Sequence, residues 1–421
     1  MTTKYWQPKA VAIEQESSVQ ITANDVTTTY ILTVNGIDVS VPGNAGGVND
    51  TASDLADAWN ASTYPYFSEI TALASTDTVT LTADVAGLPF TVTSSVSGGT
   101  GTIGAVSDDT AATGPNSWDN ADNWSGGVVP VNSDDVIIAN TDVPITHGLD
   151  QSAVTLATLR VDRSFTGHIG LDYAAVATSA DGLTTDNGVP EYRDTYLHIK
   201  SAAVNIGQNY GQDIPAGSGR IMLNLDSTAC QVTIHDTAAA SSDQGRPSIR
   251  LKANSASTDI FVRKASGGFG IAVDEPGETS TIGDLTITDI TASTRVQVGA
   301  GVTLTNYLQS GGQNIVQAAA TITLLEITGG TLTTEGDYTI TTCNVKGGTL
   351  NSNHVKTAGN CITTLNLTGG TITTQGNGEA RTINSLVLGT GGALRSDGGV
   401  VAVTGITEPT GRYTLSMGTQ S

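Results

Sequence analysis

One phrase recurs in the final third of the chain, as LEITGGTL at 325–332, CNVKGGTL at 343–350 and LNLTGGTI at 365–372. A looser copy, LVLGTGGAL, spans 386–394, and partial copies begin at Tyr307 and Leu285. The last apolar residue before each turn recurs in steps of 21, 19, 18, 22 and 21 positions, in the series Ile287, Leu308, Ile327, Val345, Leu367 and Leu388. A period of about 20 residues, built of short alternating strands and glycine corners, predicts a β-solenoid in which each coil stacks on the one before.

The alternation inside the phrase predicts which side chains face the core. We expect the recurring aliphatic residues to stack as an inward ladder, and the residue after each, such as Thr328, Lys346 and Thr368, to face water. Tight corners are expected at the Gly-Gly pairs 311–312, 329–330, 347–348, 369–370 and 391–392. An antiparallel β-sandwich with coincidental Gly-Gly turns is the alternative, but it gives no reason for one phrase to keep one spacing.

The pattern continues upstream in a weaker form. Apolar residues still alternate at Leu156 to Val161, at Val204 and Ile206, and at Val232 and Ile234. If 151–405 all belong to the solenoid, the rod has about twelve coils.

Composition agrees with turn-rich β structure and excludes several classes of function. The 421 residues include 49 glycines, and 18 Lys and Arg against 40 Asp and Glu give a net charge of −22. Such a balance argues against nucleic acid as a partner, because phosphate binding needs clustered basic side chains. No run of about 18 apolar residues occurs, so no membrane partner is expected either. The N-terminus lacks a secretory signal pattern, and we expect synthesis in the cytoplasm with another route of delivery.

A separate small module is predicted ahead of the rod. Alternating apolar residues lead from Tyr30 into Asn35-Gly36 and out to Val41, which is a strong hairpin signal. A helix is expected over 51–60, with Thr51 as its cap.

Two further strands, near 79–83 and 90–96, complete a ββαββ order in which the helix covers one face of a four-stranded sheet. The fold class is therefore all-β, a parallel β-helix or solenoid preceded by a small ββαββ module. The expected divisions are an anchoring arm at 1–18, the module at 19–108, a linker and solenoid cap at 109–150, the solenoid at 151–405 and a tail at 406–421.

Between module and rod stands WDNADNWSGGVVP at 118–130, followed by DDVII at 134–138. This segment resembles the one that opens many β-solenoid surface proteins of bacteria and, in chains without a signal peptide, virion structural proteins of tailed bacteriophages. The arm KYWQPKAVAI at 4–13 and the module are similar to the N-terminal parts of such phage proteins.

The resemblance implies location and partners, not a reaction. We expect a structural protein of the virion rather than an enzyme, attached to other virion proteins through 1–108, with the solenoid projecting. Head decoration is the favoured role, and a homotrimer is the oligomer implied by resemblance to projecting virion proteins. Three alternatives stay open: a tail spike or fibre that binds host surface glycan, a polysaccharide lyase or hydrolase on the same solenoid, and a bacterial surface adhesin.

Residues with chemical potential are few, and we assign no catalytic, cofactor-binding or metal-binding residue. The histidines are scattered without ligand spacing, so zinc is not expected. Cys230 and Cys343 are in phase with apolar neighbours and are expected to be small core residues. Gly99, Gly101 and Gly104 match a dinucleotide fingerprint, but no helical pattern follows to hold a pyrophosphate.

Acidic loops are the remaining candidates. Asp119 and Asp122, and a second group formed by Asp181, Asp186, Glu191 and Asp194, are candidates for holding Ca²⁺ or for pairing carboxylates in glycoside cleavage. Arg193 is the best basic partner for such chemistry. The interpretation that we favour is that these residues stabilise turns.

Trp118 and Trp124 allow two interpretations of the same kind. An exposed pair would offer a stacking surface to a sugar. We expect instead that they cap the open end of the rod, because an uncapped solenoid exposes its core.

Overall fold

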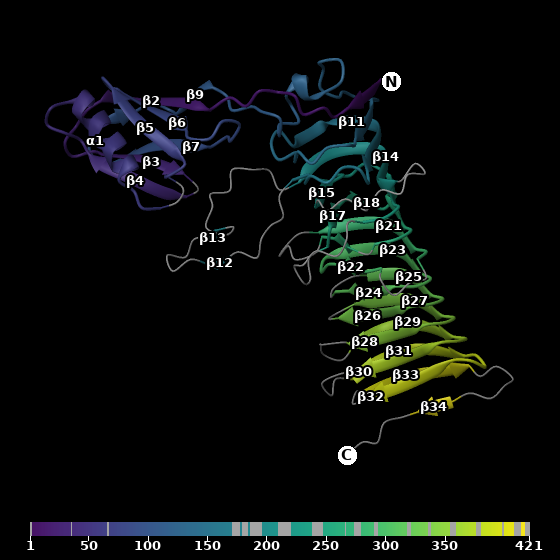
Figure 1. Ribbon diagram of the computed structural model, residues 1–421. Coiled ribbons are helices and arrows are strands. Elements are labelled where there is room, and N and C mark those ends of the chain that lie inside the picture. Colours follow the sequence, from purple (N-terminus) through teal and green to yellow (C-terminus); the bar gives the residue numbers. More distant parts are fainter. Residues whose placement is uncertain are drawn as a thin grey trace.

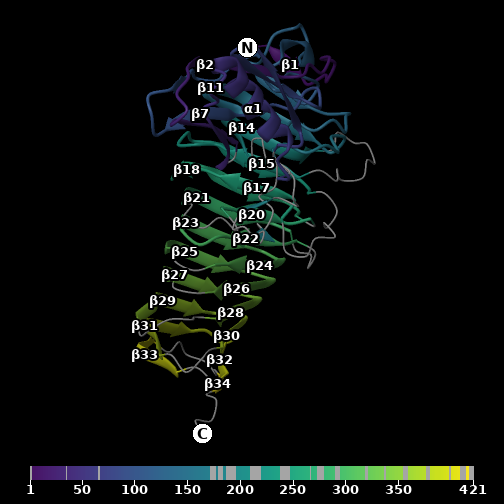
Figure 2. The same cartoon turned by 90° about the vertical axis from the view of Figure 1, so that its left-hand side faces the viewer.

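The computed structural model is a rod with a compact module at its N-terminal end (Figures 1 and 2). The structure describes residues 2–416 except 35, 65–66, 171–176, 179–183, 186–195, 209–219, 238–246, 266, 273–278, 290–293, 318–320, 336–337, 354–358, 376–379, 398–399 and 408–413. The rod is a parallel β-solenoid, as the repeat predicts.

One strand of every coil belongs to a continuous parallel ladder along the rod. In order these strands are β1 (Thr3–Tyr5), β10 (Asp135–Ile138), β11 (Asp150–Asp162), β14 (Leu197–Gln208), β16 (Gln231–Ile234), β19 (Asp259–Val262), β21 (Ser280–Ile287), β23 (Val302–Gln309), β25 (Thr321–Ile327), β27 (Thr339–Val345), β29 (Gly359–Leu367), β31 (Ala380–Leu388) and β33 (Val400–Thr407).

A second ladder forms another wall of the rod. Its strands are β15 (Ile221–Asn224), β17 (Ile249–Lys252), β20 (Phe269–Ile271), β22 (Val296–Val298), β24 (Gln313–Val316), β26 (Thr331–Glu335), β28 (Thr349–Asn353), β30 (Thr371–Gln375), β32 (Ala393–Asp397) and β34 (Thr414–Ser416). The short β18 (Asn254–Ser255) pairs with β21, and β12 (Ala177–Thr178) pairs with β13 (Thr184–Thr185) outside the ladders.

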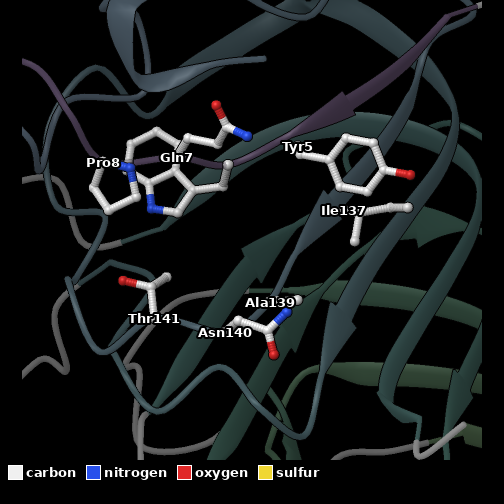
Figure 3. Close-up of a pocket in the computed structure, with 8 residues that line it drawn as sticks. Tyr5, Gln7, Pro8, Ile137, Ala139, Asn140 and Thr141 are labelled. Carbon is white, nitrogen blue, oxygen red and sulfur yellow. The ribbon is translucent and has the colours of Figure 1, made fainter.

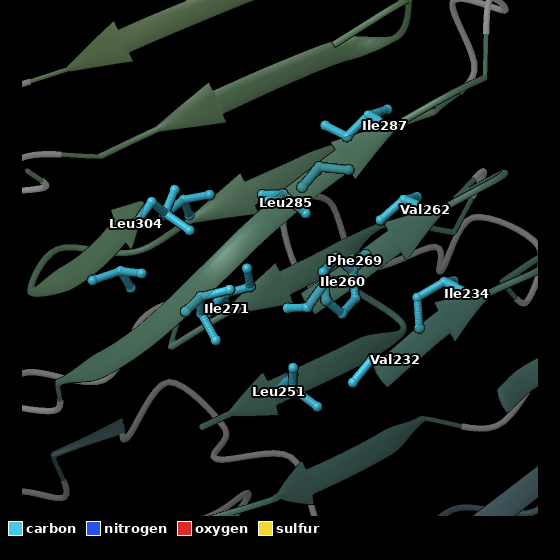
Figure 4. Close-up of a cluster of buried hydrophobic side chains, with 14 of the residues drawn as sticks. Val232, Ile234, Leu251, Ile260, Val262, Phe269, Ile271, Leu285, Ile287 and Leu304 are labelled. Carbon is cyan, nitrogen blue, oxygen red and sulfur yellow. The ribbon is translucent and has the colours of Figure 1, made fainter. Parts of the chain in front are cut away.

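The strand register confirms that equivalent residues stack from coil to coil. One unbroken series of backbone partners contains Val136, Leu159, Val204, Val232, Ile260, Leu285, Tyr307, Leu325, Cys343, Leu365, Leu386 and Ile406. Figure 4 shows part of this core, where Val232, Ile260 and Leu285 rise through successive strands. Ten of these twelve positions lie within 151–405, where about twelve coils are expected, and Val136 and Ile406 lie outside that range. Cys343 takes its place among the apolar residues.

The predicted ladder is wrong at one position. Ile287 and Ile327 both pair with Gln309, whereas Leu308 pairs with Thr286 and is only half-buried. Gln309 is 2 % exposed, and it is stabilised inside because its amide oxygen accepts a hydrogen bond from Tyr307 Oη (2.9 Å). A buried polar group is tolerated where it finds such partners.

The Gly-Gly corners are explained by two different constraints. Gly347, the first of its pair, has an ordinary φ, but a Cβ there would lie 2.4 Å from the carbonyl oxygen of Thr328 in the preceding coil. Gly330, the second of its pair, has φ +74°, a conformation that L residues rarely adopt. Neither glycine of the pair 391–392 has a positive φ, so the fifth corner differs from the others.

The solenoid extends beyond the predicted limits at both ends. The boundary at 151 falls inside β11, and β10 and β1 precede it in the same ladder. The predicted tail at 406–421 contains the end of β33 and β34. Residues 3–5 of the predicted arm are therefore a strand of the rod.

The N-terminal module has the predicted strand and helix order, with additional strands, and it forms two sheets rather than one. One sheet contains β2 (Glu16–Ala23), β5 (Ile70–Ser75), β6 (Thr78–Ala83), β8 (Thr102–Ile103) and β9 (Ser107–Thr110), and the other contains β3 (Thr29–Val34), β4 (Ile37–Pro42) and β7 (Val92–Ser97). Both sheets and the helix α1 (Val48–Asn60) contribute to one apolar core.

The helix begins earlier than predicted, and Thr51 is not its cap. The cap position is Gly47, and Thr51 lies inside the helix with its hydroxyl hydrogen-bonded to Asn24 Oδ1 (2.7 Å). Trp59 is buried against Phe67 in an edge-to-face contact, and its indole N–H donates to Ile70 O (2.8 Å). That hydrogen bond ties the helix to β5.

Candidate functional site

Three tryptophans close the N-terminal end of the solenoid. Trp124 packs edge-to-face on Trp6 and on Trp118, with ring centroids 5.0 Å and 4.7 Å apart. All three are buried in the same core as Val136 of β10. The expectation that Trp118 and Trp124 cap the rod is thus confirmed, and the sugar-stacking alternative fails because neither ring is accessible.

The third member of this cap comes from the predicted arm. Trp6 N donates to Ile137 O (3.0 Å) at the end of the β1–β10 pairing. On the other side of β1, Ser125 N donates to Tyr5 O (3.0 Å) and Tyr5 N donates to Ser125 Oγ (2.9 Å). The outer edge of the first strand is therefore occupied by the loop that carries Trp124.

Asn123 joins the two segments through which the chain passes between module and rod. Its side chain is fully buried, and Oδ1 accepts hydrogen bonds from Lys9 N and Ala10 N, both at 3.0 Å. Its amide nitrogen donates to Gly114 O (2.8 Å) and Ser117 O (2.9 Å). One amide thus satisfies backbone groups of both segments, which fixes their relative position.

The two segments also pair with each other directly. Ile13 N donates to Thr113 O (2.8 Å) in an antiparallel bridge. We call residues 7–15 and 111–117, with Asn123 between them, the neck.

The acidic residues between the tryptophans serve no shared site. Asp119 and Asp122 are exposed, and the turn is stabilised by Asn120, whose side chain accepts a hydrogen bond from Asp122 N (2.9 Å). The other predicted acidic group, Asp181, Asp186, Glu191 and Asp194, lies outside the described residues, as does Arg193. In the part of the chain that is described, no three His, Cys, Asp or Glu side chains are placed to hold a metal ion.

A charged cluster that the sequence did not predict lies on the flank of the rod. Asp236 Oδ2 lies 3.4 Å from Arg163 Nη2 and 3.3 Å from Lys264 Nζ, so one carboxylate joins cations from two other coils. The Asp236 side chain is 7 % exposed. Nearby, Arg160 Nε and Nη2 donate hydrogen bonds to the two carboxylate oxygens of Asp162, at 2.6 and 2.7 Å, so both of these oxygens already have a partner.

A second cluster surrounds a histidine. His198 Nδ1 lies 3.7 Å from Asp150 Oδ1, and its Nε2 lies 3.9 Å from Asp226 Oδ2. Lys200 Nζ is 3.6 Å from the same Asp226 oxygen. Two carboxylates therefore flank one imidazole, each at a distance longer than a direct hydrogen bond.

Two further histidines, His168 and His235, have lowered pKa values. His168 Nδ1 accepts a hydrogen bond from Arg220 N (3.0 Å), and burial followed by the charge of Arg220 lowers the pKa of His168. Burial and Arg263 lower the pKa of His235 in the same way. Burial raises the pKa of the Cys230 and Cys343 thiols to about 12, as expected of buried core residues.

Comparison with protein-family models, with curated proteins and with solved structures finds no match for this chain. Among the described helices, none has the length and apolar character needed to cross a bilayer.

Proposed function

We propose that this protein is a structural component of a tailed-bacteriophage virion, attached through its N-terminal region, with the solenoid projecting outward as a head decoration. The observation that carries the proposal is the difference between the neck and the rod. The rod repeats one ladder along its length, whereas the tryptophan cap and the Asn123 hydrogen bonds, which join distant parts of the chain, lie at the module end. Such a difference between the two ends suits a protein that is attached at one end and projects at the other.

Two further properties support an exterior position. The net charge of −22 repels packaged nucleic acid and favours solvation. The outward positions after the core ladder, such as Thr328 and Thr368, are exposed, as the repeat predicts for a surface in water.

Electron microscopy of particles made with this chain tests the proposal. A gold label on the C-terminus is expected on the outside of heads, set away from the shell by the length of the rod. Gold on the tail would overturn head decoration and indicate a tail spike or fibre instead. Particles without label would refute a role in the virion. The mass of the purified protein in solution tests the accompanying proposal of a trimer.

The His198 cluster favours polysaccharide cleavage as a second candidate function. Glycoside hydrolysis uses two carboxylates in distinct roles, and Asp150 and Asp226 are the pair that approach a proton-transfer group. If the rod is an enzyme, host polysaccharide incubated with it gains reducing ends, and D226N abolishes their release. An unchanged rate in D226N would exclude this site.

A further inference from the structure

A hollow of about 440 Å³ lies beside the tryptophan cap. Residues 5–8 of the first strand and its extension form one side, and residues 137 and 139–141 around the end of β10 form the other. Figure 3 shows Tyr5, Gln7 and Pro8 across the hollow from Asn140 and Thr141. Its volume falls within the range of roughly 300–1,000 Å³ that is usual for small-molecule sites.

The lining mixes apolar and polar groups in similar shares and contains no charged residue. It combines the half-exposed ring of Tyr5, the buried indole of Trp6 and the uncharged polar side chains of Gln7, Asn140 and Thr141. No charged side chain is among the lining residues, although Lys9 Nζ donates to the lining Gln7 (2.9 Å). The net charge of −22 of the whole chain disfavours an anionic ligand. A metal cation would find no carboxylate in the lining.

Several hydrogen-bonding groups of the lining are free for a ligand. Gln7 uses its amide oxygen to accept from Lys9 Nζ (2.9 Å), which leaves its NH₂ group directed elsewhere. Thr141 Oγ1 accepts from Val143 N (3.1 Å) and still has its own proton to donate. Asn140 is exposed, and its side-chain amide has no partner among the described residues.

The indole of Trp6 forms an apolar part of the wall. Trp6 is 3 % exposed, and its Nε1 has no hydrogen-bond partner among the described residues. Trp118 Nε1, in the same cap, likewise has no partner among the described residues, so this property does not distinguish the hollow. Trp6 therefore contributes to the wall of the hollow with its ring rather than with its N–H.

Both walls are fixed before any ligand arrives. Trp6 N and Gln7 N donate to Ile137 O (3.0 Å) and Asn123 O (2.7 Å). Asn140 has φ +57°, and its N–H donates to Ser164 Oγ (3.0 Å), which holds the turn in an unusual conformation that asparagine tolerates. Preorganised walls lower the entropic cost of binding.

We propose that this hollow binds one residue of an uncharged sugar. The ring of Tyr5 packs on the apolar face of the pyranose, and Gln7, Asn140 and Thr141 exchange hydrogen bonds with its hydroxyl groups. The inference does not depend on a place in a virion, because it concerns the isolated chain.

Saturation-transfer NMR and calorimetry on the full-length protein test the proposal. The probes are the neutral methyl glycosides of glucose, galactose, mannose and N-acetylglucosamine, with methyl glucuronide as the charged counterpart. At least one neutral glycoside is expected to bind with a millimolar Kd, as a single sugar subsite allows, and the glucuronide is expected to bind more weakly.

Two variants locate the binding, and a third controls for loss of any exposed tyrosine. N140G keeps a residue that accepts the positive φ and removes the amide, and Y5A removes the ring; each is expected to raise Kd about tenfold. Y64A removes an exposed tyrosine of the module and is expected to bind as the parent protein does. The proposal is overturned if no neutral glycoside gives a saturable signal at about 50 mM. It is overturned equally if N140G and Y5A bind unchanged, or if the glucuronide binds as tightly as the neutral sugars.

Discussion

Replacing Asn123 with alanine should loosen the neck while leaving the rod folded. The side chain makes four hydrogen bonds, of which those to Ala10 N, Gly114 O and Ser117 O are buried and that to Lys9 N is partly buried. At about 1–1.5 kcal/mol for each bond, the loss is about 4–6 kcal/mol of local stability. Since the two segments of the neck have few other links, most of this loss should appear as local opening rather than global unfolding.

Hydrogen exchange at the amides of Lys9 and Ala10 measures the effect directly. A loss of only 1.4 kcal/mol already gives tenfold faster exchange, so N123A is expected to accelerate these amides by at least about a hundredfold. N120A is the comparison variant, because Asn120 lies in the same loop but its side chain reaches the neck through a single partly buried hydrogen bond, from its Nδ2 to Thr113 Oγ1 (2.7 Å). It makes no bond to Lys9 or Ala10 among the described residues, so these amides are expected to exchange at nearly the parent rate. If both amides in N123A exchange at the parent rate, Asn123 does not hold the neck together.

Three further outcomes are expected. W124A should lose about 3–5 kcal/mol in urea unfolding followed by fluorescence, as large-to-small changes in a core do, whereas W124F should retain most of the packing. G330A should be less stable than G36A in thermal unfolding, because both positions have positive φ but only at Gly330 does a Cβ meet backbone, 2.5 Å from Gly311 C; equal losses would contradict this. Cys343 should resist alkylation in the folded state, and alkylation without unfolding at pH 8 would refute its burial. Folding raises the pKa of its thiol from 9.0 to about 12, so the thiol ionises first in the unfolded state. The stability of the folded state should therefore fall as pH rises above about 9.

Much of the rod could be predicted because its physics is local and repeated. The repeated coils place apolar residues inward and glycine at the corner, so the spacing alone predicts that Val345 and Leu367 face the core and stack on each other. The error at Leu308 has the opposite cause. Gln309 is inward because Tyr307 gives it a partner inside the core, and polarity patterns do not contain that information.

The N-terminal end was harder to predict because it depends on contacts between distant residues. β1 pairs with β10 across some 130 positions, as in Thr3 with Asp135, and a strand of three residues carries no periodic signal. The helix begins before the predicted residue because its N-cap is Gly47, which has no side chain to give the sequence pattern of a cap.

The Arg163–Asp236–Lys264 cluster did carry a signal that the sequence analysis missed. Each of its members follows an inward ladder residue by two positions, after Val161, Ile234 and Val262 respectively. Asp236 and Lys264 share this offset in neighbouring coils, so alignment of the coils predicts their contact. Arg163 precedes Asp236 by two coils, because Ile206 of β14 lies between Val161 and Ile234 in the ladder. The irregular loop lengths between these coils concealed the alignment.

The occupied edge of β1 and the repeated coils together limit how such a rod can change in length. Because Trp124 and Ser125 cover that edge, a second molecule cannot extend the sheet there, and end-to-end polymerisation from this side is blocked. Within the regular region each coil touches only its neighbours, so duplication or deletion of one whole unit would change the reach by about 4.8 Å and leave the neck intact. The length of the rod can therefore change in evolution without a change in the neck.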